Sequence, residues 1–457
     1  MNKNQNEVML KSFNGLDKRA GAEENTLIEL KNISSKHFPS LKTRCGRKKL
    51  FTAPNGEEIL SMFVSSKIYV TTNKNGHTVL YSGDSIDNLT AVFEANDDEL
   101  ASSVITRFNN KVCIFNLKTA LDTQTLMVAS DTTMDYPSRY EAPTFNDVVV
   151  FENRVIGCRK KQLRGCKLGD IAVWEVKEED GKDRAFLKNF ELKSEFTACK
   201  TYKNRAVFFT KDEMLELRGT NADNFDLIKI ADVGCINKEA ICEVDGMLYF
   251  VSKEGVMRYS GNTPIIVSDS ICDKVYRASN GGRAALGAGI HTLYALFDDQ
   301  KGKRLYTLNT EKGVWAKEDD FAAVCFEKIE GFSFGATKEG IYSLDGDEAD
   351  DIFENDKDSF EWEIITQDIH SYCTQKKRGS KIIFRIENEK TTRTEVYVSL
   401  DRGEFELVGA VISEGAKTVC LPLSQKEYDS IRIKLRGRGK CSIPYISRVY
   451  SFGGEAL

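Results

Sequence analysis

The segment MLYFVSKEGVMRY (247–259) contains two short apolar runs separated by a polar turn, and Asp245-Gly246 comes directly before the first run. Runs of this kind, bounded by Gly and Asp, predict the two strands of a β-hairpin. Similar runs recur along the chain at steps of 44, 43, 51, 42, 45 and 40 residues, which is an internal repeat. They begin at Lys67, Lys111, Arg154, Arg205, Met247, Thr292 and Phe332.

A repeat of this length, built from short strands, is typical of β-propeller blades. Helical repeats would instead place apolar residues at i, i+3, i+4 and i+7, and the chain has almost no such spacing. We therefore expect an all-β protein with a six- or seven-bladed β-propeller over residues 51–358. The blade count stays open because a strand from the other end of the repeat region can complete one blade.

The two ends of the chain differ from the repeats. Residues 31–49 carry seven Lys and Arg side chains and no acid, and Pro39 and Gly46 interrupt them. We expect residues 1–50 to be an extended basic arm that orders only in an assembly, because it has little apolar surface to bury. From Phe360 onward, runs such as EWEIIT, KIIFRI and EVYVSL alternate apolar and polar residues. They predict a separate β-sandwich over 359–457.

The composition is that of a soluble globular protein. Among 457 residues there are 64 Lys and Arg and 69 Asp and Glu, so the net charge of −5 excludes a surface that is basic all round. The N-terminus has no apolar signal segment and no run is long enough to span a bilayer, so we expect synthesis in a cytosol. The twelve cysteines form no C-x-x-C pair and are expected to be reduced, and four scattered histidines predict no metal site.

Three motifs have a chemical and a structural interpretation. The Gly-rich SNGGRAALGAG (279–289) lacks the spacing of a phosphate-binding loop and is expected to be an irregular connection between blades. SLDRG (399–403) matches half of a sialidase Asp-box, and we interpret it as a hairpin turn. The acid-rich run 345–358 lacks the ligand order of a calcium loop and is expected to be a solvated linker.

Two cationic strips are the candidate contact sites. In IRIKLRGRGK (431–440) a cation stands at every second position, so a strand places all of them on one face. That face is either solvated or a contact for a phosphate backbone or an acidic partner. The strand strip is Arg432, Lys434, Arg436 and Arg438, and the arm strip is Lys42, Arg44, Arg47, Lys48 and Lys49. No nucleophile with a base and an orienting group is evident, so we expect no catalytic residue and no cofactor.

Several segments resemble a known family. The opening FNGLDKRAGAEENTLIELKNISSKHFPSLKTRCG (13–46) resembles the N-terminal segment of tailed-phage virion propellers, which begins Gly-Leu-Asp/Asn-x-Arg. Further matches follow in the expected order at GCKLGDIAVWEV (165–176), FFTKDEMLELRGT (208–220), residues 232–271 and residues 431–450. The resemblance is to packaged-DNA stabilisation proteins and tail nozzle or hub proteins, and its weight lies in the collinearity of loose structural motifs.

This resemblance implies a structural virion component rather than an enzyme. Such a subunit forms a ring in the neck or tail, docks on portal, adaptor or tail proteins, and helps to retain or conduct packaged DNA through non-specific contacts. It would be assembled in the host cytoplasm, with no membrane insertion and no cofactor. The alternative from another class is a glycan-binding or degraded glycoside-hydrolase-like propeller that acts in host receptor binding.

Overall fold

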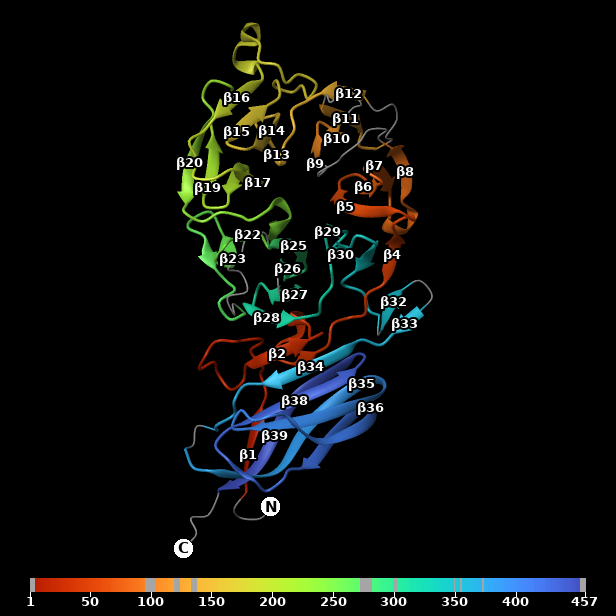
Figure 1. Ribbon diagram of the computed structural model, residues 1–457, viewed down its shortest axis with the longest axis vertical. Helices are drawn as coiled ribbons and strands as arrows, with labels where there is room; N and C mark the ends of the chain where they lie inside the picture. The colour runs from red at the N-terminus through yellow and green to blue at the C-terminus, as the bar shows by residue number, and fades with distance from the viewer. Residues whose placement is uncertain are drawn as a thin grey trace.

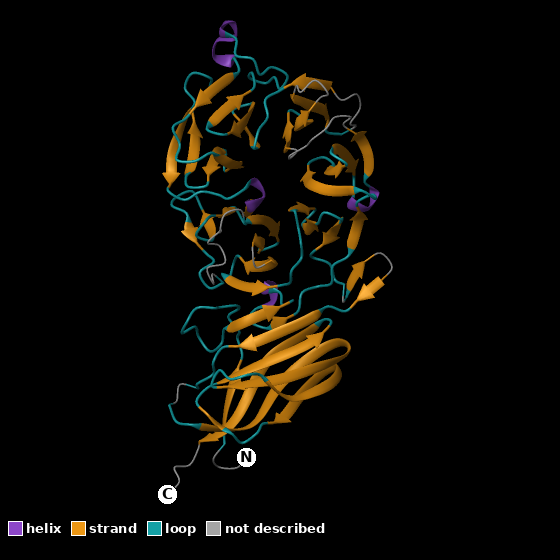
Figure 2. Cartoon of the chain, in the orientation of Figure 1, coloured by secondary structure: helices purple, strands orange, loops and turns teal. Residues whose placement is uncertain are grey.

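The computed structural model describes residues 5–94, 104–118, 124–132, 138–271, 282–299, 302–348, 350–353, 356–371 and 374–452. Within them the chain is almost entirely β-structure (Figures 1 and 2). The helices of these described ranges are four short 3₁₀ turns: η1 (Ser35–His37), η2 (Ile86–Asn88), η3 (Glu178–Asp183) and η4 (Lys238–Ala240). The all-β prediction is therefore confirmed.

Seven four-stranded antiparallel sheets form a closed propeller (Figure 1). Blades 1 and 2 consist of β5 (Glu57–Val64), β6 (Ile68–Lys74), β7 (His77–Gly83), β8 (Thr90–Glu94), β9 (Val104–Phe108), β10 (Lys111–Lys118), β11 (Gln124–Ser130) and β12 (Ser138–Glu141). Blades 3 and 4 consist of β13 (Asp147–Phe151), β14 (Arg154–Arg159), β15 (Gln162–Gly165), β16 (Phe186–Asn189), β17 (Phe196–Tyr202), β18 (Arg205–Thr210), β19 (Met214–Arg218) and β20 (Asp226–Ala231).

The remaining blades are 5 to 7. Blades 5 and 6 consist of β21 (Ile241–Val244), β22 (Met247–Val251), β23 (Val256–Tyr259), β24 (Ile265–Ile266), β25 (Arg283–Gly289), β26 (Thr292–Asp299), β27 (Gly302–Asn309) and β28 (Val314–Lys317). Blade 7 consists of β29 (Cys325–Ile329), β30 (Phe332–Ala336), β31 (Gly340–Ser343) and β4 (Lys49–Thr52). Each of the seven predicted runs is the second strand of a blade.

The turns before these second strands have the geometry that their residues favour. Asn109-Asn110 has φ values of 48° and 59°, and Asp245-Gly246 has values of 50° and 70°. Two consecutive residues with positive φ match the type I′ turn, whose twist suits a tight hairpin, and Asn, Asp and Gly adopt it most readily. Glu152-Asn153 and Lys203-Asn204 repeat this conformation in blades 3 and 4. The local sequence therefore fixes the hairpin that opens each of these blades.

The ring is closed by a strand from the N-terminal segment. Strand β4 pairs with β31, with Thr52 opposite Gly340, so the last blade contains one strand from each end of the repeat region. Such closure removes the unpaired edges that an open row of blades would leave. The blade count is seven. The glycine-rich run, where it is described, is also regular: Arg283–Gly289 is strand β25 and not an irregular connection.

The C-terminal part is one curled sheet rather than a two-sheet sandwich (Figure 1). Its nine strands are β1 (Asn6–Leu10), β2 (Leu27–Lys31), β3 (Leu41–Lys42), β34 (Glu361–Thr366), β35 (Lys377–Leu400), β36 (Glu406–Pro422), β37 (Glu427–Tyr428), β38 (Ile431–Arg438) and β39 (Cys441–Phe452). A separate hairpin, β32 (Asp351–Phe353) and β33 (Asp356–Asp358), precedes it.

The curl comes from the length of β35. Its first half pairs with β39, from Lys377 to Asn388, and its second half pairs with β38, from Glu395 to Leu400. KIIFRI and EVYVSL, which we read as two strands, are therefore parts of one strand of 24 residues. Because this strand crosses the whole sheet with β36 along its other side, the sheet bends instead of dividing into two layers.

The N-terminal residues 1–50 are not a free arm. In the described part, β1 and β3 pair with β39, and β2 pairs with β34, so the segment is woven into the C-terminal sheet. Apolar residues are spread thinly through it, and Phe13, Leu16 and Leu30 among them are buried. The expectation of an unfolded arm was wrong. It rested on the local composition, which is dominated by cations, whereas the scattered apolar residues pack against distant parts of the chain.

One apolar cluster joins the sheet to the propeller. It runs from Trp362 in β34 through Phe13 and Leu16 to Trp315 in β28. Backbone bonds reinforce the contact, because the Leu16 N–H donates to the Trp315 carbonyl at 2.8 Å. The same connection carries the charged residues described next.

Candidate functional site

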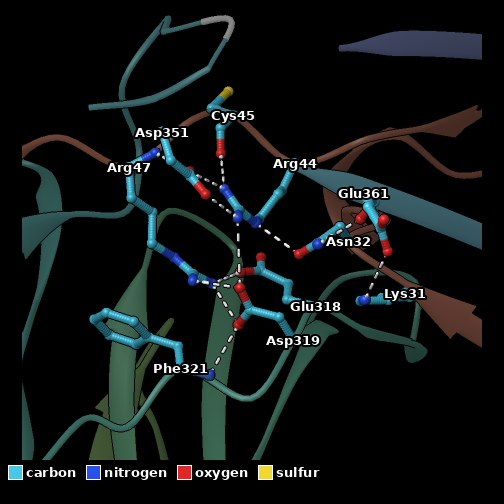
Figure 3. A network of polar contacts seen from close by, with 10 residues as sticks. All are labelled: Lys31, Asn32, Arg44, Cys45, Arg47, Glu318, Asp319, Phe321, Asp351 and Glu361. Carbon is cyan, nitrogen blue, oxygen red and sulfur yellow. Dashed lines mark hydrogen bonds and ion pairs between the residues drawn. The ribbon is translucent and has the colours of Figure 1, made fainter. Parts of the chain in front are cut away.

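A buried network of ion pairs lies where the propeller meets the C-terminal sheet (Figure 3). Residues 43–48 run through it from β3, in the sheet, to β4, in blade 7. Arg44 and Arg47 of the arm strip lie in this connection and are only 4% and 5% exposed. Charges buried to this degree need charged or hydrogen-bonded partners.

Arg44 ties the connection to the hairpin before the sheet. Its two terminal nitrogens donate to the two carboxylate oxygens of Asp351 at 2.7 and 2.8 Å, a bidentate pair. Its Nε donates to Oδ1 of Asn32 at 2.7 Å, and the guanidinium lies 4.2 Å from the ring centre of Phe360. Arg44 also reaches the propeller, because a terminal nitrogen lies 3.4 Å from Oδ2 of Asp319.

Arg47 ties the same connection to the propeller. Its terminal nitrogens donate to both carboxylate oxygens of Asp319 at 2.5 and 3.0 Å and to Glu318 at 2.9 Å. The guanidinium lies 4.3 Å from the ring centre of Phe321. The backbone N–H of Arg47 donates to the Asp351 carboxylate at 2.8 Å. Asp351 and the loop after β28 are therefore held by one short stretch of chain.

The charges in this network are mutually dependent. Burial alone would raise the pKa of Asp319, but the guanidinium charges of Arg47 and Arg44 outweigh it and lower that pKa to about 2. Burial is the larger effect on Glu318, whose pKa is raised above its ordinary value. Burial alone would lower the pKa of Arg47, and the nearby carboxylates instead hold it above its ordinary range. Removing any one of these charges would leave another buried without compensation.

The structure thus corrects the arm strip. Arg44 and Arg47 are buried and paired with acids of the same chain, so they cannot face DNA or a neighbouring subunit. Lys42 is half-buried in β3, Lys49 is half-buried in β4, and Lys48 is exposed between them. The five cations are therefore spread through a buried connection and do not form one contact strip.

In the strand strip, Arg436 and Arg438 are exposed, Arg432 and Lys434 are half-buried, and all four are paired. Arg432 donates to both oxygens of Asp368 at 2.7 and 3.0 Å. Lys434 pairs with Glu363 at 2.6 Å. Arg436 and Arg438 both bond Glu361, at 3.1 and 3.2 Å, and these hydrogen bonds lower the pKa of the Glu361 carboxyl. As predicted from the alternation, these four cations lie on one face, whereas Ile431, Ile433 and Leu435 are buried.

The acid-rich run is not a solvated linker. Asp351 pairs with Arg44, and Asp350 pairs with Lys390. Asp345 accepts hydrogen bonds from the Tyr294 hydroxyl at 2.7 Å and from the Ser333 backbone N–H at 3.0 Å, so it links blades 6 and 7. In the described part of the chain, no group of three or more His, Cys, Asp and Glu side chains is placed to hold a metal ion.

Sequence reasoning missed Glu318 and Asp319, the propeller half of the network. They stand in the acidic run Glu318-Asp319-Asp320 directly after β28. The signal available in the sequence was this run of acids after a buried strand, whose charge is opposite to that of the cations after β3. The pairing itself spans about 270 positions and is set by the fold. The ten cysteines within the described ranges are free thiols, and eight of them are buried.

Among the helices of the described residues, none is long and apolar enough to cross a membrane. No family model matches the chain, and no curated protein matches it. Solved structures with some likeness include an acylaminoacyl peptidase from Pyrococcus horikoshii, at 10% identity and a TM-score of 0.41, which covers 67% of this chain and 58% of that one. An exo-β-1,3-galactanase from Phanerochaete chrysosporium has 9% identity and a TM-score of 0.27, with 89% and 100% coverage. At these TM-scores the likenesses carry no argument about function.

Proposed function

We propose that the chain is a structural subunit of a tailed-phage virion without catalytic activity. It forms a ring in the neck or tail as a nozzle or hub, docks on a portal or adaptor, and helps to retain or conduct packaged DNA. The collinear resemblance of five segments to such proteins supports this proposal. These segments fall on scaffold parts: residues 208–220 cover most of the β18–β19 hairpin, 232–271 cover blade 5, and 431–450 cover β38 and most of β39.

The observation that carries the proposal is the weaving of the N-terminal segment through both parts of the molecule. Strands β1 to β3 belong to the sheet and β4 belongs to blade 7, and the buried network of Arg44 and Arg47 fixes the passage between them. Two parts held by strand pairing, a shared apolar core and buried ion pairs behave as one rigid body. A rigid brace is what a ring under the pressure of packaged DNA requires.

The experiment is to purify particles of the phage that carries the gene and to identify their proteins by mass spectrometry. We expect the chain in the particles at a copy number that matches a ring. A nonsense mutation in the gene should give particles that package DNA and then lose it, and a suppressor host should restore retention. Absence of the chain from purified particles, or full DNA retention without it, would contradict the proposal.

A further inference from the structure

The outer face of the C-terminal sheet, referred to here as the outer sheet face, carries side chains that point away from the core on β34, β38, the second half of β35, and β36. The strand registers place Leu407 opposite Tyr397 and Tyr397 opposite Lys434 in one row. The next row holds Ala410, Glu395 and Arg436. Alternate residues of the same strands, such as Val396 and Leu435, are fully buried.

This face has more positive than negative charge. The carboxylate of Glu361 forms ion pairs with three cations, Lys31, Arg436 and Arg438. The carboxylate of Asp368 forms ion pairs with two cations, Arg402 and Arg432. With the pairs Lys434–Glu363 and Arg393–Glu395, these ion pairs bring together seven cations and four carboxylates, an excess of three cations among the paired side chains. The intramolecular pairs therefore reduce the charge of the face without neutralising it.

An apolar edge borders these charges. Strand β36 pairs only with β35 among the described strands, so it is an edge of the sheet. Leu407 and Ile412 on this strand are 55% and 67% exposed, and Phe405 before it is 36% exposed. Lys434 links the two regions, because its Nζ lies 5.7 Å from the ring centre of Phe405. Apolar residues beside unbalanced charge on a free edge strand are typical of an interaction surface.

The opposite end of the molecule has complementary chemistry. Residues 175–183, here the acidic tip, contain five acids and two lysines, a net charge of −3. The tip includes η3 and lies at the end of the propeller farthest from the C-terminal sheet (Figure 2, helix at the top). Glu175 and Glu178 are 75% and 84% exposed at their side chains, and Val176 between them is an exposed apolar residue.

We infer that the outer sheet face binds the acidic tip of a second copy of this chain, in a head-to-tail contact. The tip and the face of one molecule lie at opposite ends, so they can meet only between molecules. The tip and the face carry charges of opposite sign, and Val176 can contact the exposed apolar residues at the β36 edge. A heterologous contact of this kind generates rings or open chains rather than closed pairs.

This inference deepens the proposed function, because a ring subunit needs a contact with its neighbour, and it rests on that function only for the closure of a ring. The tip is only nine residues long, so we expect each contact to be weak by itself. Repetition around a ring, where each subunit is held at two sides, would multiply its effect. The experiment below uses the purified full chain, whereas the proposed function is tested on particles, so either can fail without the other.

The first measurement is sedimentation velocity of the purified chain over a range of concentrations. We expect oligomers that grow with concentration at low salt and associate at least tenfold more weakly at about 1 M salt, where the screening length is about 3 Å. The tip variant Glu175→Lys/Glu178→Lys and the face variant Arg436→Glu/Arg438→Glu should each be monomeric. The matched control Lys253→Glu/Lys338→Glu reverses two exposed, paired cations of the propeller and should associate like the unaltered chain.

The decisive step is to mix the two variants. The intact tip of the face variant can bind the intact face of the tip variant, and the reversed tip meets a reversed face of opposite charge, so the mixture should recover association that neither variant shows alone. A second variant, Leu407→Ser/Ile412→Ser, changes no charge and should weaken association at least tenfold while the circular dichroism spectrum stays unchanged. A monomeric unaltered chain, a face variant that associates normally, or a mixture that does not recover association would each overturn the inference. So would a face variant that self-associates normally and loses only binding to duplex DNA.

Discussion

The substitution Arg47→Met tests whether the buried network holds the two parts of the molecule together. Methionine keeps the aliphatic part of the side chain, but it removes the guanidinium with its positive charge and its contact with the Phe321 ring. Glu318, which is buried, and Asp319, which is half-buried, then lose their main partner. Breaking a buried ion pair by removing one partner costs about 3–5 kcal/mol of folding free energy.

Urea unfolding followed by tryptophan fluorescence measures this loss. Trp315 in the propeller and Trp362 in the C-terminal sheet are both buried, one on each side of the junction. Their emission therefore reports the opening of the junction. With a slope of about 3 kcal/mol per molar urea, we expect the midpoint to fall by about 1–1.7 M. The matched control is Lys48→Met, which removes the exposed charge next along the chain and should change the free energy of unfolding by less than about 0.5 kcal/mol.

A third variant separates lost attraction from lost packing. Arg47→Met combined with Glu318→Gln and Asp319→Asn removes the uncompensated charges, so it should be more stable than Arg47→Met alone. The reasoning is refuted if Arg47→Met costs no more than Lys48→Met, or if neutralising the two acids fails to recover any stability.

Three further predictions follow from single features of the fold. Burial raises the pKa of Glu327 to about 7, against a smaller opposite effect of a nearby lysine. The free energy of unfolding should therefore fall as the pH rises from about 4.5 to 7, because the folded state holds a proton that the unfolded state has lost. In Glu327→Gln, the thermal unfolding midpoint should no longer fall over this pH range. Gly437→Ala should cost about 1–3 kcal/mol of unfolding free energy, because a Cβ there would lie 2.5 Å from the ring of Trp362. Trypsin should leave the bonds after Arg44 and Arg47 intact in the free subunit, which peptide mapping checks.

Each of these has an internal control. Glu243→Gln alters an exposed acid and should leave the pH dependence unchanged. Gly409→Ala places its Cβ at an ordinary 3.4 Å from Leu421 and should be tolerated. Trypsin should cut after Lys182 in the exposed tip under the conditions in which the bond after Arg47 resists. Equal effects in a variant and its control would contradict the corresponding prediction.

Local signals predicted the propeller well because blades are built from neighbouring residues. The turn pairs Asn109-Asn110 and Asp245-Gly246 specify hairpins by their own backbone preferences, and the spacing of the second strands specifies the repeat. The alternation in β38 likewise predicted which side chains lie outward. Each of these inferences depends on contacts between residues a few positions apart.

The errors concern partners that are distant in sequence. The cations around Arg44 and Arg47 have the local composition of a solvated arm, and only the fold brings Asp319 and Asp351 to them. The bend of β35 was read as a break between two strands, because residues 388–394, Asn-Glu-Lys-Thr-Thr-Arg-Thr, are polar and resemble a turn. Sequence patterns report the preference of a segment, whereas burial of its charges depends on what packs against it.

The most direct test of the whole account is a cryo-electron microscopy map of the particles that carry this chain. The account predicts a symmetric ring at the neck or tail in which each subunit is a seven-bladed propeller joined rigidly to a curled sheet, with the acidic tip of one copy on the outer sheet face of the next. A map of intact particles whose neck and tail hold no density of this shape would contradict it.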